Sequence, residues 1–228
     1  MAKPPERRSS PQEIAQFLQK SGTIAQFVEK QPRLLFAIDA TASRQPTWDR
    51  ASHLQQEMFR ASGAVATLAV QLCYYRGFAE FRASRWLTDS AALARLMGQV
   101  RCEGGHTQIA RLLRHALTEH RKVAMRALVF IGDAVEENPD TLCDLAGQCG
   151  LLQLPLFLFQ EGREPPVEKA FRAMAKLSGG AYARFDSSSP QALAALLGAV
   201  AAYAAGGRAA LERRGGDSAK LLFQQLKT

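Results

Sequence analysis

The chain has 228 residues, of which 47% are hydrophobic and 22% charged, and its formal net charge is +8. This composition fits one soluble globular domain with extensions, long enough to bury a substantial core. Basic residues are mixed with acids and no run interleaves them with aromatics, so we expect no nucleic-acid-binding face. A net positive charge would still attract acidic protein partners.

Targeting signals and cysteine spacing give an expectation for the cellular compartment. The first eight residues lack the apolar core of a signal peptide, and the most apolar stretch, 192–205, is shorter than the ~20 residues that a membrane span needs. Cys73, Cys102, Cys143 and Cys149 show no Cys-x-x-Cys spacing and are typical of buried, reduced thiols. We therefore expect a cytoplasmic protein without a membrane span.

The two ends of the chain differ from its middle. Residues 1–10 are rich in Pro, Ser and charge, and the apolar residues of 11–30 recur at helical spacing, interrupted by Ser21-Gly22. They predict two short helices, either packed on the domain or offered to a partner. We expect an N-terminal extension over 1–30, one domain over 31–206, and a charged tail over 207–228 in which Leu221 to Leu226 could form a docking helix.

The apolar run Leu34–Ile38 is followed by Asp39, Thr41 and Ser43. Such a run, bounded by polar residues, predicts a strand buried on both faces, as in a parallel sheet covered by helices. Open α/β sheets place ligand sites at the carboxyl ends of their strands. One carboxylate and two hydroxyls there are hard oxygen ligands suited to Mg²⁺. The alternative interpretation is a strand stopped by an Asx or Ser/Thr turn.

The remaining elements alternate strands with helices, which predicts βαβ units and a mainly parallel sheet. A second apolar run ends in Gly132-Asp133, and a Gly-Gly-His-Thr loop ending at Thr107 opens an amphipathic helix. In the first half of the chain we expect a helix over 47–62, a strand over 67–75, an antiparallel edge strand over 81–87, a helix that begins after its N-cap Asp89 and ends at Met97, and a helix from Gln108. In the second half we expect a strand over 127–133, a helix over 139–149, a strand over 154–159, a helix over 165–177, an edge strand over 182–185 and a helix over 190–205.

These motifs together resemble the von Willebrand factor A (VWA) domain and its metal-ion-dependent adhesion site. That site has an Asp-x-Ser-x-Ser motif, a distant Thr and a distant Asp, which match Asp39, Thr41, Ser43, Thr107 and Asp133. The resemblance runs from about residue 33 to 205. It departs from the pattern where Thr replaces Ser at position 41 and where Ala replaces Gly at position 134, and neither change removes a ligand.

The resemblance implies a doubly wound α/β fold in which the strands ending at Asp39 and Asp133 are neighbours. It also implies that the five residues bind Mg²⁺, Mn²⁺ or Ca²⁺, and that an Asp or Glu of a partner protein completes the metal shell. This is binding without catalysis, and the glycines of the loop would let the backbone approach the metal. Because the two acids would repel each other without metal, Asp39→Asn is expected to leave the metal-free melting temperature unchanged or raised.

Three residues near the site have roles that the sequence leaves open. His106 would lie at the rim, either as a solvated loop residue or as a contact for the partner. Glu136 and Glu137 follow Asp133 closely and would either repel an acidic partner or cap the metal.

Two other functions compete with the adhesion module. Haloacid-dehalogenase-type phosphatases also begin with an apolar strand ending in Asp and later show a Gly-Asp. Their first motif carries a second acid two residues on, where this chain has Thr41, and the Gly-Gly-His-Thr loop has no role in them. A metal-free scaffold of the same fold is the third possibility, in which the acids and hydroxyls only cap strands.

Overall fold

The computed structural model describes residues 10, 12, 31–42, 68–186 and 190–226. The chain divides into two compact units, Met1–Gln31 and Pro32–Thr228, and the description below concerns the second. The two helices expected over 11–30, the helix expected over 47–62 and Ser43 lie outside the described residues.

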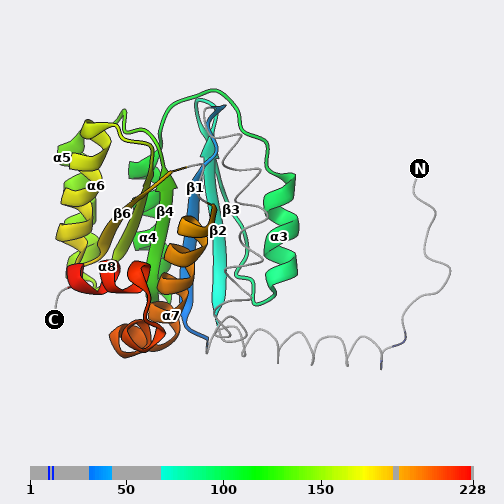
Figure 1. Cartoon of the computed structure of the whole chain (residues 1–228). Coiled ribbons are helices and arrows are strands. Elements are labelled where there is room, and N and C mark those ends of the chain that lie inside the picture. Colours follow the sequence, from blue (N-terminus) through cyan, green and yellow to red (C-terminus); the bar gives the residue numbers. More distant parts are fainter. Residues whose placement is uncertain (1–9, 11, 13–30, 43–67, 187–189, 227–228) are drawn as a thin grey trace. The chain divides into compact units, whose positions relative to one another are not determined.

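A six-stranded sheet in the order β3-β2-β1-β4-β5-β6 forms the centre of this unit (Figure 1). Every neighbouring pair is parallel except β2 and β3, which are antiparallel. The doubly wound, mainly parallel sheet with one antiparallel edge strand is therefore confirmed. Its strands are β1 (Arg33–Asp39), β2 (Ala69–Arg76), β3 (Glu80–Ala83), β4 (Met125–Gly132), β5 (Leu156–Glu161) and β6 (Ala181–Phe185).

β1 is buried along its whole length because helices cover both faces of the sheet. Leu34, Phe36 and Ile38 point to one core, and Leu35 and Ala37 point to the other. The unbroken apolar run is thus explained by two-sided burial.

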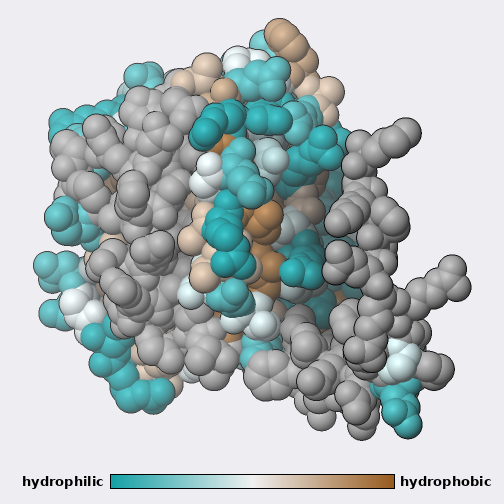
Figure 2. Space-filling view, turned by 90° about the vertical axis from the view of Figure 1, so that its right-hand side faces the viewer, coloured by the Kyte–Doolittle hydropathy of each residue, from teal (hydrophilic) through white to brown (hydrophobic). Residues whose placement is uncertain are grey.

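Three described helices cover each face of the sheet (Figure 1). α3 (Ser90–Gln99), α7 (Pro190–Arg214) and α8 (Asp217–Gln225) pack on the first, and α4 (Ile109–Lys122), α5 (Pro139–Leu151) and α6 (Pro165–Ser178) pack on the second. Figure 2 turns the α3 side to the viewer, and the described side chains there are mainly hydrophilic, with apolar residues in a narrow band between them.

The local signals in the sequence place the ends of these helices well. Asp89 caps α3 by accepting a hydrogen bond from Ala91 N at 2.9 Å. α6 ends at Gly179, whose φ of 71° lies in the left-handed region that favours glycine. The antiparallel edge strand is shorter than expected, since the ladder of β3 stops at Ala83 and only an isolated bridge joins Leu87 to Val70.

The C-terminal segment packs on the sheet, which the sequence left open. The chain leaves helical geometry at Gly206 and Gly207, as the glycine break suggests, but helical structure resumes and buries Leu211 and Leu222 in the first core. The Gln225 amide also pairs with both backbone groups of Tyr182, at 3.0 and 2.9 Å. α8 therefore protects the outer edge of β6 against pairing with another strand.

One described helix, spanning Gln191–Arg214, is long and apolar enough to cross a membrane by length and composition alone. Half of its most apolar window is buried inside the protein. A core helix of a folded domain passes the same test, and α7 packs against β4, β1 and β6.

The four cysteines form no disulfide with one another; Cys73 and Cys149 are buried, while Cys102 and Cys143 are partly exposed. Burial raises the pKa of Cys149 to about 12 and raises the pKa of Cys73 further, so neither forms the reactive thiolate near neutral pH. We expect a thiol-specific reagent to modify two cysteines in the native protein and four after unfolding. Cys102→Ser should reduce the native count to one, and rapid native reaction of all four would contradict the burial.

Candidate functional site

The predicted site residues gather at the carboxyl ends of β1 and β4. Asp39 is the last residue of β1, and Asp133 directly follows β4. The two strands pair in parallel with Ile38 opposite Ile131, so one step further along Asp39 lies beside Gly132. Neighbouring strands are about 4.8 Å apart. The adjacency expected for these two strand ends is therefore present.

Asp39 is fully buried and its carboxylate is held from two sides. Oδ1 accepts a hydrogen bond from Thr41 N at 2.7 Å, and Oδ2 accepts one from the Tyr75 hydroxyl at 3.1 Å. The bond to Thr41 N is the Asx-type turn that the alternative interpretation of this motif predicts. Asp39 thus has a structural role whether or not it binds a ligand.

Sequence reasoning missed Tyr75, which lies opposite Asp39 on β2. Its ring is buried against Phe130, with ring centroids 6.1 Å apart. Burial raises the pKa of Tyr75, and the negative charge of Asp39 and the hydrogen bond to it raise it further, with smaller effects from Glu137 and Asp133. Three carboxylates therefore lie close enough to act on one hydroxyl, which stays a hydrogen-bond donor.

Asp133 differs from Asp39 in having one carboxylate oxygen without a hydrogen-bond donor among the described residues. Its Oδ1 is buried, and no hydrogen-bond donor reaches it from any of the described residues. Most buried polar atoms have a partner, because burying one without a partner costs free energy. Within the part of the chain that the structure describes, this oxygen is an unused acceptor at the end of β4.

The glycine loop is tied to the ends of β1 and β2 through backbone hydrogen bonds. Glu103 N donates to Ala40 O at 3.0 Å, Gly77 N donates to Glu103 O at 3.4 Å, and His106 N donates to Gly77 O at 3.3 Å. A Cβ at Gly105 would lie only 1.9 Å from Gly77 O. Gly105 is therefore required because the backbones of the two loops are in close contact. The sequence analysis gave a different reason for the glycines, namely the approach of the backbone to a metal.

Thr107 and Glu136 hold each other in place. Thr107 N donates to Glu136 Oε2 at 2.8 Å, and Glu136 N donates to the Thr107 hydroxyl oxygen at 3.1 Å. Because Glu136 lies three residues after Asp133, this reciprocal pair brings Thr107 to the end of β4. The Thr107 hydroxyl oxygen keeps a second lone pair that could bind a cation.

Glu137 caps α4. Its carboxylate accepts from Ile109 N at 2.6 Å and from Ala110 N at 2.8 Å, whereas Gln108, at the N-cap position, makes no capping bond with its side chain. A carboxylate at this end of a helix also interacts favourably with the helix dipole. Glu136 and Glu137 are thus both bound to backbone N–H groups at or just before the start of α4, a structural role that the sequence analysis did not consider.

We expect Glu137→Ala to lower the free energy of unfolding by about 1–2 kcal/mol, because it removes two charge-assisted hydrogen bonds to the first turn of α4. Glu164→Ala is the matched control, since Glu164 occupies the N-cap position of α6 without making a capping bond. Urea denaturation of the two variants measures the difference. Equal losses of stability would contradict the capping role.

The structure therefore places four of the five predicted ligands, Asp39, Thr41, Thr107 and Asp133, at the carboxyl ends of β1 and β4 or in the loop hydrogen-bonded to them. Ser43 lies outside the described residues. The described residues contain no group of three or more His, Cys, Asp or Glu that could hold a metal ion. The predicted site has only two carboxylates, so its remaining donors are hydroxyls.

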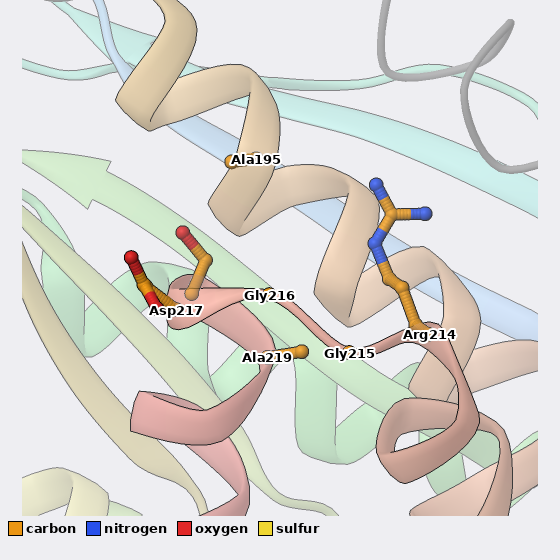
Figure 3. A pocket seen from close by; sticks show the side chains of 7 residues that line it. Ala195, Arg214, Gly215, Gly216, Asp217 and Ala219 are labelled. Atoms are coloured by element: carbon orange, nitrogen blue, oxygen red, sulfur yellow. The ribbon is translucent and has the colours of Figure 1, made fainter.

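A separate pocket of about 550 Å³ lies where the end of α7 meets the start of α8 (Figure 3). None of its lining residues belongs to the predicted site. They are Ala195, Arg214, Gly215, Gly216, Asp217, Ser218 and Ala219.

Comparison with known proteins identifies the fold. No family model and no curated protein matches the chain. Among solved structures, the SpRpn10 VWA domain is 11% identical with a TM-score of 0.54, covering 72% of this chain and 95% of that domain. The von Willebrand factor domain of the type V pili tip protein Mfa5 from Porphyromonas gingivalis is 9% identical with a TM-score of 0.59, covering 75% and 94%.

A third similar structure is the manganese-loaded TRAP protein of Plasmodium vivax, which is 14% identical with a TM-score of 0.53, covering 73% of this chain and 72% of that one. At such low identities the likeness shows the fold and nothing finer. The chain has a von Willebrand factor A-like α/β fold.

Proposed function

We propose that this protein is an interaction module that binds one divalent cation through Asp39, Thr41, Ser43, Thr107 and Asp133, and through it an acidic side chain of a partner protein. The observation that carries the proposal is the buried Asp133 Oδ1, which lacks a partner among the described residues although it lies at the strand end next to Asp39. A cation is the ligand that such an oxygen, beside a second carboxylate, would attract most strongly.

The chemistry of the donor set fits a hard divalent cation. Carboxylate and hydroxyl oxygens suit Mg²⁺, Mn²⁺ and Ca²⁺ better than they suit softer metals. Two carboxylates at neighbouring strand ends repel each other when no cation lies between them. The manganese-loaded TRAP structure supports the proposal, because it is a similar fold that holds such an ion.

The surrounding residues would orient the ligands before any ion arrives. Tyr75 and the Thr41 backbone fix the Asp39 carboxylate, and Glu136 fixes Thr107. A cation held largely by neutral hydroxyls would keep enough positive charge to attract a partner carboxylate. This preorganisation reduces the ordering cost of binding.

The phosphatase alternative is not favoured. Its second acid is replaced by Thr41, whose backbone closes the turn on Asp39. The loop around Gly105, which has no role in that reaction, is hydrogen-bonded here to Ala40 and Gly77. We therefore propose binding without catalysis. The cytoplasmic location stays a prediction.

Affinity capture from cell extract tests this function. We expect the wild type to retain partners in Mg²⁺ and to release them in EDTA, while Thr107→Val retains none in either buffer. Partners that stay bound in EDTA would contradict the metal-dependent mechanism. Turnover of a generic phosphomonoester by the wild type, lost in Asp39→Asn, would instead support the phosphatase.

A further inference from the structure

The turn between β2 and β3 exposes an aromatic residue beside the candidate site. Phe78 is 80% exposed and lies edge-on to His106, with ring centroids 5.6 Å apart. His106 is itself exposed and directly precedes Thr107. An apolar ring and an imidazole therefore form one surface next to a candidate metal ligand.

Backbone hydrogen bonds join the two loops that carry Phe78 and His106. Gly77 N donates to Glu103 O, His106 N donates to Gly77 O, and the absent Cβ of Gly105 allows the two loops to touch. Single exposed apolar side chains are common on protein surfaces and need no explanation by themselves. An aromatic residue beside hydrogen-bonded backbone is different, because only its side-chain torsions are ordered when a partner packs against it, and aromatic residues often dominate binding energy.

Charges of both signs lie around this turn, since the Glu136 carboxylate is 3.3 Å from His106 Nδ1 and Arg111 lies on the other side. Arg111 Nη1 donates to Ala79 O at 2.7 Å and to the Gln108 side chain, so its charge lies beside Phe78. Among the described residues, Arg111 forms no ion pair with a carboxylate. Its uncompensated charge favours acidic partners over basic ones.

We infer that Phe78 and His106 bind an apolar side chain of the partner, adjacent in its sequence to the acid that completes the metal shell. The recognised segment is thus an acidic residue with an apolar neighbour. This inference rests on the proposed function, because it requires the partner acid to reach the cation.

Peptide display tests this specificity. A phage library of nonapeptides with a fixed central Asp or Glu and random flanks is panned on the full chain in Mn²⁺ and eluted with EDTA. The wild type should enrich Leu, Ile, Phe or Met next to the acid. Phe78→Ala should lose that enrichment and bind the best peptide at least tenfold more weakly, while calorimetry shows unchanged Mn²⁺ binding.

Leu151→Ala is the matched control, since Leu151 is another highly exposed apolar residue, 86% exposed, at the end of α5. It should select the same peptides as the wild type, and Phe78→Leu should restore part of the affinity. If peptide binding is abolished by EDTA but Phe78→Ala changes the peptide affinity by less than twofold, the inference is overturned and the proposed function stands. A wild type that yields no EDTA-eluted peptide would overturn the proposed function and this inference with it.

Discussion

Gly105→Ala is expected to lower the free energy of unfolding by roughly 3 kcal/mol, whereas Gly104→Ala is expected to leave it unchanged or raise it by up to about 1 kcal/mol. An added Cβ at position 105 would lie 1.9 Å from Gly77 O and 2.2 Å from Gly77 C. At position 104 it would meet nothing within 4 Å. The two neighbouring glycines thus form a matched pair.

The cost at Gly105 is large because backbone atoms cannot rotate away as a flexible side chain can. Relief of the contact requires the two loops to separate, which breaks the hydrogen bonds joining Gly77 to Glu103 and His106. Urea denaturation with matched m-values measures the difference between the variants. Equal stabilities would show that the two loops do not pack as the structure describes.

Asp133→Asn is expected to be at least as stable as the wild type in EDTA and less stable than the wild type in Mg²⁺. In EDTA the variant should be as stable as the wild type or more stable by about 1 kcal/mol, because it removes a negative charge whose Oδ1 is buried without a described partner and relieves repulsion from Asp39. In excess Mg²⁺ only the wild type gains binding free energy, about 2.7 kcal/mol when the ion is at 100 times its dissociation constant.

Asp39→Asn is expected to differ from Asp133→Asn in its stability in EDTA. Asp39 accepts hydrogen bonds at both carboxylate oxygens, from Thr41 N and from Tyr75, and an amide has only one oxygen acceptor. This variant should therefore lose about 1–2 kcal/mol even in EDTA, which revises the expectation from sequence that it would lose nothing. Thermal melts of three proteins in two buffers provide the comparison, and an Asp133→Asn variant destabilised equally in both buffers would mean that Asp133 has only a structural role.

The predictions that succeeded depended on local patterns. The buried run of β1, the cap at Asp89 and the left-handed turn at Gly179 each act within a few residues, so the sequence displays them directly. The neighbouring placement of β1 and β4 came from the family resemblance, because strand periodicity says nothing about which strands pair.

The features that sequence reasoning missed depend on tertiary contacts. Tyr75 meets Asp39 across 36 residues, and Glu137 caps a helix that begins 28 residues earlier. Gly105 is explained only by the position of Gly77. The segment after Gly206 and Gly207 is rich in charge, which predicts a tail. Its helical structure is stabilised by burial of Leu211 and Leu222, and charge content does not reveal that burial.

Calorimetric titration with Mg²⁺ and Mn²⁺ tests the metal site most directly. Wild type and Thr118→Val should each bind one ion, because the Thr118 hydroxyl donates to the Arg114 carbonyl within α4, away from the predicted site, while Thr107→Val should bind none. Equal binding by all three proteins, or no binding by the wild type, would contradict the account.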